Sequence, residues 1–180
     1  QSAGTAVADV LFCVYNPAGR LPITFYKSDS DLPPFVDYTM ENRTYRYFKG
    51  QPLYGFGYGL SYTTFNYDQM NVPESSTKGK EVPVSVRVTN TGKLAGEEVV
   101  QVYITNPDKS IKTALKSLKG FSRISLKPGE SKIVSFLLSP QDLSYINAKG
   151  ESTPFQGKIE ISTGGSQPDE TAKTSGNITK

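Results

Sequence analysis

Apolar residues recur with two different periods at the two ends of the chain. Near the N-terminus they fall three or four positions apart, which is typical of one stripe of an amphipathic helix. This stripe consists of Ala3, Val7, Val10, Leu11 and Val14. The turn residues at 16–19 are expected to end the helix, and residues 21–25 predict a short strand. A helix of about ten residues and one strand cannot bury their own apolar face, so we expect something else to cover it.

From about residue 62 the apolar period changes to two, which indicates half-buried strands. Turn residues such as Asn-Thr-Gly at 90–92 and Lys-Pro-Gly-Glu at 127–130 separate these segments. The predicted strands are residues 64–72, 82–88, 100–104, 118–126, 133–138, 158–162 and a last one near Ile178. About seven strands with this turn spacing predict an immunoglobulin-like or fibronectin type III-like sandwich. Without a Cys pair or a Trp, the antibody-type core is excluded and the fibronectin-like version fits.

Residues 26–62 form a long connector that is rich in aromatic side chains. A flexible linker is rich in Gly and Ser or in Pro and lacks such side chains. We therefore expect the connector to lie against a surface, with its Tyr rings buried and their hydroxyl groups paired or wet. The Gly-Phe-Gly-Tyr-Gly run at 55–59 lacks the spacing and the Lys-Ser/Thr ending of a phosphate loop, so it predicts tight turns between packed aromatic rings.

The composition excludes several functional classes. The 20 basic and 17 acidic residues give a net charge of only +3 and are scattered, which does not favour nucleic-acid binding. No apolar run is long enough for a membrane span. The chain has no His and one Cys, so a Ser-His-Asp triad and a zinc site of Cys and His are excluded, and we expect no metal and no cofactor. Cys13 is expected to pack beside the apolar stripe.

A glycosidase needs two carboxyl groups at a defined separation. The carboxylates considered for such a pair are Asp9, Asp31, Asp37, Glu41, Glu97 and Glu98. For Asp9 in the helix the default interpretation is a capping or ion-pairing role. For the connector acids it is a solvated or Arg-paired role, with Arg43 and Arg46 as partners. Glu97 and Glu98 open a strand, where adjacent side chains point to opposite faces and cannot cooperate. We therefore expect no catalytic residue in this chain.

Several strings of residues resemble the C-terminal part of glycoside hydrolase family 3, most closely the bacterial β-glucosidases and β-xylosidases that end in a fibronectin type III-like domain. These strings are residues 8–12, 16–25, 45–48, 52–65, 86–92, 95–103, 118–121 and 126–130. They follow one another in order over nearly the whole chain. One departure is Cys13, which stands where the family usually has Gly after the helix.

The resemblance implies a mostly β chain of three parts. Residues 1–25 are the last helix and strand of an α/β/α sandwich domain, 26–62 the connector, and 63–180 the fibronectin type III-like domain. It also implies that the catalytic Asp and Glu of a retaining, exo-acting hydrolase lie in upstream domains, in the same chain or a separate one. The expected substrate is a β-glucoside first and a β-xyloside second, such as a cello- or xylo-oligosaccharide, and the expected location is secreted or periplasmic.

Within that frame this chain has a structural task, packing on the catalytic domains. The residues expected at domain interfaces are Arg20, Arg43, Tyr45, Arg46, Tyr47 and Tyr54. The alternative is a stand-alone β-sandwich module that binds a polysaccharide or a cell surface. Residues 1–62 discriminate between the enzyme segment and the stand-alone module. A stand-alone module does not need a helix and a strand without packing partners, nor an aromatic connector.

Overall fold

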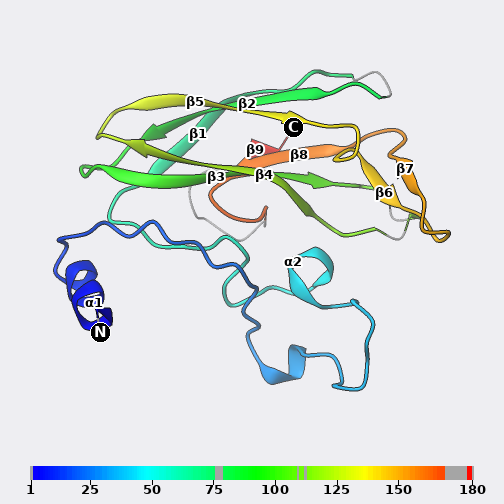
Figure 1. Cartoon of the computed structure of the whole chain (residues 1–180), viewed down its shortest axis with the longest axis horizontal. Coiled ribbons are helices and arrows are strands. Elements are labelled where there is room, and N and C mark those ends of the chain that lie inside the picture. Colours follow the sequence, from blue (N-terminus) through cyan, green and yellow to red (C-terminus); the bar gives the residue numbers. More distant parts are fainter. Residues whose placement is uncertain (1, 76–78, 109, 112, 169–177, 180) are drawn as a thin grey trace.

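Two antiparallel sheets face each other in the C-terminal two-thirds of the chain (Figure 1). The computed structural model describes residues 2–75, 79–108, 110–111, 113–168 and 178–179. One sheet has the order β1 (Phe65–Asn71), β2 (Val82–Asn90), β5 (Ser131–Leu138). The other has the order β4 (Ser117–Leu126), β3 (Gly96–Thr105), β8 (Glu160–Gly164), β9 (Ile178–Thr179). The predicted fibronectin-like sandwich is confirmed.

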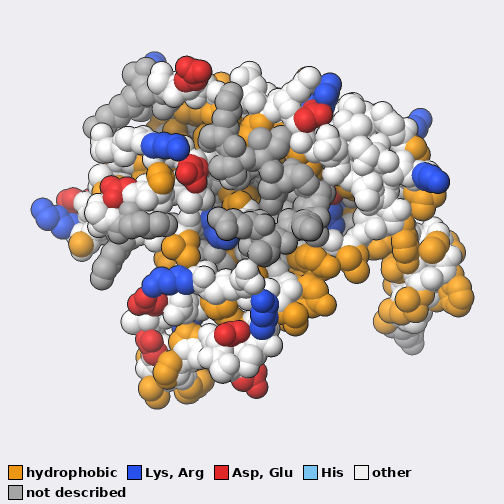
Figure 2. Space-filling model, turned by 180° about the vertical axis from the view of Figure 1, so that it is seen from behind, with side chains coloured by type: hydrophobic (Ala, Val, Ile, Leu, Met, Phe, Trp, Pro, Cys, Tyr) orange, Lys and Arg blue, Asp and Glu red, His pale blue; other side chains and the backbone are white. Residues whose placement is uncertain are grey.

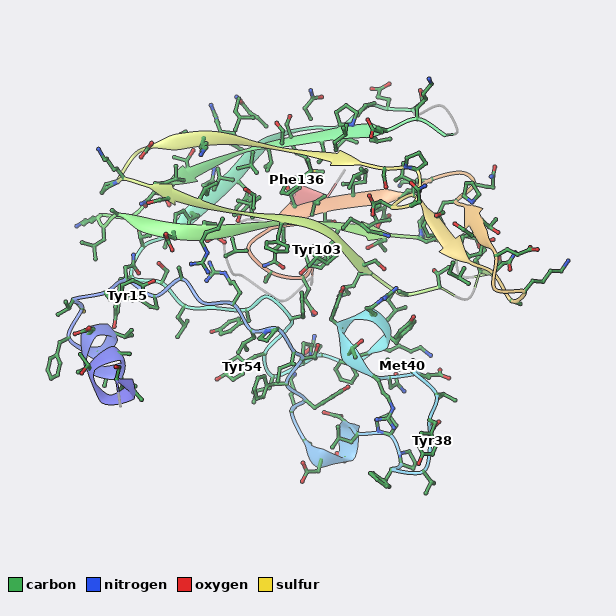
Figure 3. The ribbon with its side chains drawn as sticks, viewed as in Figure 1. Tyr15, Tyr38, Met40, Tyr54, Tyr103 and Phe136 are labelled. Atoms are coloured by element: carbon green, nitrogen blue, oxygen red, sulfur yellow. The ribbon has the colours of Figure 1, made fainter. Side chains whose placement is uncertain are left out.

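The core lies between the two sheets, as the alternating pattern predicts. The valines at 82, 84, 86 and 88 of β2 are at most 4% exposed, while the residues between them face outward. Burying each such side chain contributes about 1.5–3 kcal/mol. Figure 3 shows Phe136 of β5 between the sheets, and a Cβ atom added at Gly120 of β4 would lie 3.2 Å from its ring. Gly120 thus leaves room for Phe136 against the opposite sheet.

A second, small hairpin follows the sandwich strand β5. It consists of β6 (Ser144–Ile146) and β7 (Ser152–Pro154), paired antiparallel. The sequence pattern does not predict this hairpin, since two runs of three residues carry almost no periodic signal.

Residues 2–62, called the arm below, cross one side of the sandwich and project beyond it (Figure 1). The arm contains α1 (Ala3–Leu11), the 3-10 turn η1 (Asp29–Asp31) and the single helical turn α2 (Thr44–Tyr47). The sequence analysis did not predict the last two. The remaining arm is irregular and is tied to the sandwich by the contacts described in the next section.

The helix α1 ends earlier than predicted, at Leu11 instead of at the turn residues 16–19. Cys13 adopts a left-handed conformation, with φ of 60°. The amide of Cys13 donates to the Val10 carbonyl and the amide of Val14 to the Asp9 carbonyl, which together form a Schellman motif. Cys13 is exposed and does not pack beside the apolar stripe as predicted. Its backbone conformation is one that Gly adopts without strain.

The strand predicted at residues 21–25 was wrong. Among the described residues this segment forms only an isolated antiparallel bridge between Phe25 and Tyr54. Leu21 exchanges hydrogen bonds with the loop 55–59, donating to the Tyr58 carbonyl and accepting from the Gly57 amide. Between these two points Pro22 has no amide hydrogen to donate, which interrupts a regular ladder.

Candidate functional site

The arm is attached to the sandwich first at Asn16, just beyond α1. The Asn16 side-chain amide donates to the Ala95 carbonyl over 2.9 Å. Its Oδ1 atom accepts from the Ser61 hydroxyl at 3.0 Å and from the Tyr62 amide at 2.8 Å. The Asn16 side chain thus joins the segment after α1 to the last residues of the arm and to the loop that precedes β3. The sequence analysis interpreted Asn16 only as a turn residue, and nothing in its local pattern indicates these distant partners.

The second attachment is an ion pair between Arg20 of the arm and Glu98 of β3. Arg20 Nη2 lies 2.8 Å from Glu98 Oε2, and the two side chains are only 12% and 1% exposed. The Tyr67 hydroxyl group is buried beside this pair and has no hydrogen bond of good geometry among the described residues. Burial and the negative charge of Glu98 raise the pKa of Tyr67 well above its usual value, while Arg20 acts in the opposite direction. The arm therefore neutralises a carboxylate that the sandwich buries.

The glycine-rich loop at 55–59 lies against the last part of the sandwich. The Phe56 backbone amide donates to Gln167 Oε1 over 3.3 Å. The Phe56 carbonyl accepts from the Gln167 backbone amide over 3.0 Å. Gly57 is buried with φ of 81°, and an added Cβ atom would lie 2.7 Å from Gln101 Oε1. The loop is thus a set of tight turns between packed groups, as predicted.

Tyr45 fills the space between this loop and the sandwich. Its ring stacks on Phe56 with centroids 4.4 Å apart and meets the edge of Tyr103 at 6.1 Å. The Tyr45 hydroxyl oxygen accepts a hydrogen bond from the Leu118 amide at 3.2 Å. Tyr103 in turn donates to Gln101, and burial raises the pKa of Tyr103. Figure 3 shows Tyr103 on the arm side of its sheet, where Tyr45 reaches it.

The other expected interface residues divide into two groups. The backbone carbonyl of Arg46 accepts a hydrogen bond from the Leu115 amide over 2.7 Å. The guanidinium carbon of Arg46 lies 5.7 Å from the centre of the Tyr47 ring. Arg46 and Tyr47 also line a cavity against the sandwich. Arg43 and Tyr54 instead contact the arm itself: Arg43 donates to the carbonyls of residues 34, 37 and 39, and Tyr54 packs on Phe25 and Tyr58.

The arm leaves a large apolar surface uncovered. Figure 2 shows apolar side chains gathered on the projecting part that carries α1. Phe12 is 80% exposed, Phe35 93% and Tyr38 90%. Other exposed apolar residues of the arm are Val7, Leu11, Val14, Tyr15, Ile23, Phe25, Leu32, Val36, Met40, Leu53, Tyr54, Leu60 and Tyr62. Large exposed apolar side chains in this number are typical of an interface with other protein.

Several acidic residues of the described ranges form ion pairs with basic side chains. Glu97 and Glu98 point to opposite faces as predicted: Glu97 pairs with Arg123 on the surface and Glu98 with Arg20. Glu41 pairs with Lys49, at 2.6 Å.

The connector acids also serve the local backbone. Asp31 caps η1. Asp37 accepts from the Thr39 amide, which holds the pKa of Asp37 below its usual value. Arg43 reaches the Asp37 carbonyl and not its carboxylate.

The described residues hold no group of three or more Cys, Asp or Glu side chains that could bind a metal ion. No described helix is long and apolar enough to cross a membrane.

Comparisons with known proteins place these features. Residues 1–62 match the model of the glycosyl hydrolase family 3 C-terminal domain, and residues 98–167 match that of a fibronectin type III-like domain. A xylan 1,4-β-xylosidase of Xylanibacter ruminicola is 45% identical over 177 residues, which are 96% of this chain and 20% of that protein. A periplasmic β-glucosidase of Salmonella typhimurium is 41% identical over 175 residues, 89% of this chain and 23% of that protein.

Among solved structures, β-glucosidase 3B of Thermotoga neapolitana superimposes with a TM-score of 0.84 and 37% identity. The match covers 100% of this chain and 26% of that one. The chain thus spans about a fifth to a quarter of the length of the relatives that it matches. The two family models match in the expected order, and the alignments with these relatives cover almost the whole chain. The chain is therefore a C-terminal segment of glycoside hydrolase family 3.

Proposed function

We propose that this chain is the C-terminal part of an exo-acting β-glycosidase, in which the arm packs on the upstream catalytic domains and the sandwich fixes the arm in place. The observation that carries the proposal is the uncovered apolar surface of the arm, in a chain that matches only a fifth to a quarter of its relatives. An amphipathic helix such as α1, with no buried residue, gains its stability from packing against something else.

In this proposal the reaction belongs to residues outside the chain. A retaining mechanism needs a carboxylate nucleophile and an acid/base carboxyl group about 5–5.5 Å apart. Asp31 caps η1, and Glu41, Glu97 and Glu98 form ion pairs, so none of these four is free to act as a catalytic group. In this proposal both catalytic groups lie in the upstream domains. The names of the relatives support a β-glucoside or β-xyloside as substrate, and one relative is named as periplasmic, which supports a secreted or periplasmic enzyme.

The interface residues have two tasks in this proposal. Arg20, Tyr45 and Arg46 join the arm to the sandwich. Arg43 braces the loop that carries Phe35 and Tyr38, so that these rings are presented in a fixed conformation to the catalytic domains. The three parts, with boundaries near residues 25 and 62, then act as a docking element, a brace and an anchor.

A chimeric enzyme tests the proposal. This chain replaces the corresponding C-terminal segment of the Xylanibacter ruminicola β-xylosidase, and hydrolysis of an aryl β-xyloside is measured before and after heating. In Leu11→Asp the new carboxylate would be buried at the interface, which costs about 3–5 kcal/mol when a charge is left unpaired. We expect this chimera to lose its heat resistance and most of its activity.

The matched control is Ile133→Asp on the outer face of β5. Leu11 and Ile133 are 69% and 67% exposed, so both substitutions should leave the chain's own stability almost unchanged. Equal behaviour of the two chimeras would contradict packing of the arm on the catalytic domains. Binding of the isolated chain to insoluble cellulose or xylan, together with such equal behaviour, would favour the stand-alone module. Turnover of an aryl glycoside by the isolated chain would refute the upstream location of the catalytic carboxylates.

A further inference from the structure

A cavity lies between the arm and the sandwich, apart from the apolar surface of the arm. It has a volume of about 520 Å³ and is bounded by α2 on one side. The ends of β3 and β4 and the β6–β7 hairpin form the other sides. In Figure 1, α2 lies beside the end of the sandwich to which β4 and this hairpin run. The volume is in the range of small-molecule sites, about 300–1,000 Å³.

The charged groups that line the cavity are all positive among the described residues: they are Arg46 of α2 and Lys119 of β4. The nearest carboxylate to the Lys119 ammonium is Asp142, whose Oδ1 is 3.9 Å away, while its Oδ2 accepts from the amide and hydroxyl of Ser139. The Lys119 side chain is only 19% exposed and donates no hydrogen bond to any described residue. Burial lowers the pKa of Lys119; the charge of Asp142 acts in the opposite direction, and the charge of Arg46 adds to the lowering.

Two cations held close together repel each other, and an anion placed between them relieves that repulsion. No ion pair joins the Arg46 guanidinium to a carboxylate of the described residues, and the guanidinium lies over the face of Tyr47. Its planar donors match a carboxylate group, and the Lys119 ammonium is a second, mobile donor. The cavity therefore favours a ligand that bears a carboxylate.

The rest of the lining consists of aromatic rings and short polar side chains. Tyr145 and Phe155 form one wall, with ring centroids 5.3 Å apart and planes tilted by 30°. Tyr47 lies on the opposite side with Arg46. The polar groups are Asn106, Thr113, Ser117, Gln141, Ser144 and Ser152. Aromatic faces with hydroxyl and amide groups around them suit a ring that has one apolar face and many hydroxyl groups.

We propose that this cavity is a binding site for an acidic sugar, a uronic acid residue whose carboxylate lies between Arg46 and Lys119 and whose ring packs on the aromatic wall. The site is not catalytic, because no carboxyl group lines it among the described residues. It would hold a charged branch or end of an oligosaccharide away from the reacting bond. The site does not depend on the proposed packing of the arm on upstream domains.

The test is an NMR titration of the ¹⁵N-labelled chain with sodium glucuronate, compared with methyl β-glucoside and sodium acetate. We expect saturable shifts at residues around the cavity with glucuronate only. Lys119→Met and Arg46→Met should each weaken binding at least about tenfold, the usual loss for a hydrogen bond to a charged group. The matched control is Arg123→Met on the outer face of β4, whose partner is Glu97 and which should bind as the parent chain does.

Each other outcome overturns the proposal. Equal binding of methyl β-glucoside would show that the two cations have no role. Equal binding of acetate would show a non-specific anion site without recognition of the sugar ring. Unchanged affinity in Lys119→Met, with the fold verified from its spectrum, would place the ligand elsewhere. None of these results bears on the chimera experiment, so the two proposals can fail separately.

Discussion

Replacing Arg20 with Met removes the charge that the arm places on the buried carboxylate of Glu98. The two groups are 2.8 Å apart and Glu98 is only 1% exposed, so the remaining carboxylate would be desolvated without a counter-charge. Breaking a buried ion pair from one side costs about 3–5 kcal/mol. We expect Arg20→Met to lose stability on this scale, far more than loss of a surface charge.

The chain has one way to limit this loss, which is to release the arm. Once the segment around Arg20 leaves the sandwich, water can reach Glu98, so the cost cannot exceed the free energy that holds the arm in place. Two observables are therefore needed. Urea unfolding followed by circular dichroism measures the sandwich, and limited trypsin cleavage within residues 26–62 measures release of the arm.

The same experiment contains its controls. Arg87→Met breaks the exposed pair with Asp68, whose side chains are 39% and 35% exposed, and should have little effect on either observable. The double variant Arg20→Met with Glu98→Met removes both charges and should recover most of the loss, because a buried pair can be replaced by apolar groups at little cost. If Arg20→Met unfolds at the urea concentration of the parent and is cleaved no faster, the ion pair does not hold the arm.

Three further predictions follow from single positions. Cys13→Gly should relieve the left-handed strain at the end of α1 by about 1 kcal/mol or more, seen as slower amide exchange in residues 10–14. Gly57→Ala should destabilise more than Gly129→Ala in urea unfolding: both have φ near 80°, at 81° and 76°, but only the Cβ at 57 meets neighbouring atoms. Hydrogen bonds from Arg87 lower the pKa of Asp68 in the folded chain. The ionised carboxylate of Asp68 therefore stabilises the fold at pH values above its unfolded pKa of about 3.9. This stabilisation is lost as the pH falls through the lowered pKa of the folded state. A ¹³C titration of the Asp68 carboxyl group should show that shift, and Arg87→Gln should remove it.

The alternating pattern predicts the sandwich well because one face of each strand packs against the opposite sheet. In β2 four valines at every second position meet that condition, and all are buried. The pattern does not say which strands are neighbours: β2 pairs with β5 across more than forty residues, which is a property of the whole fold. It also fails for β6 and β7, where runs of three residues are too short to show a period.

The arm was harder to predict because its contacts are polar and distant in sequence. The spacing of Glu97 and Glu98 predicts that only one faces inward, yet not that Arg20, 78 residues earlier, is its partner. Asn16 joins residues 61, 62 and 95, and no local rule connects them. The prediction that Cys13 is buried was wrong. Apolar neighbours in the sequence favour burial, whereas the Schellman motif leaves this residue exposed.

The two sides of the arm differ in kind, and in the proposed function this difference defines the task of the sandwich. Towards the sandwich the arm makes directional contacts: the amide of Asn16, the ion pair of Arg20 and the bonds of Phe56 to Gln167. Such contacts contribute little net energy but define orientation, because each is costly when misaligned. Away from the sandwich the arm exposes Phe12, Phe35 and Tyr38, whose burial is favourable in almost any orientation. The polar contacts with the sandwich therefore fix the position of the exposed apolar side chains. In this proposal the sandwich is needed because α1 and the connector cannot fix the position of these side chains alone.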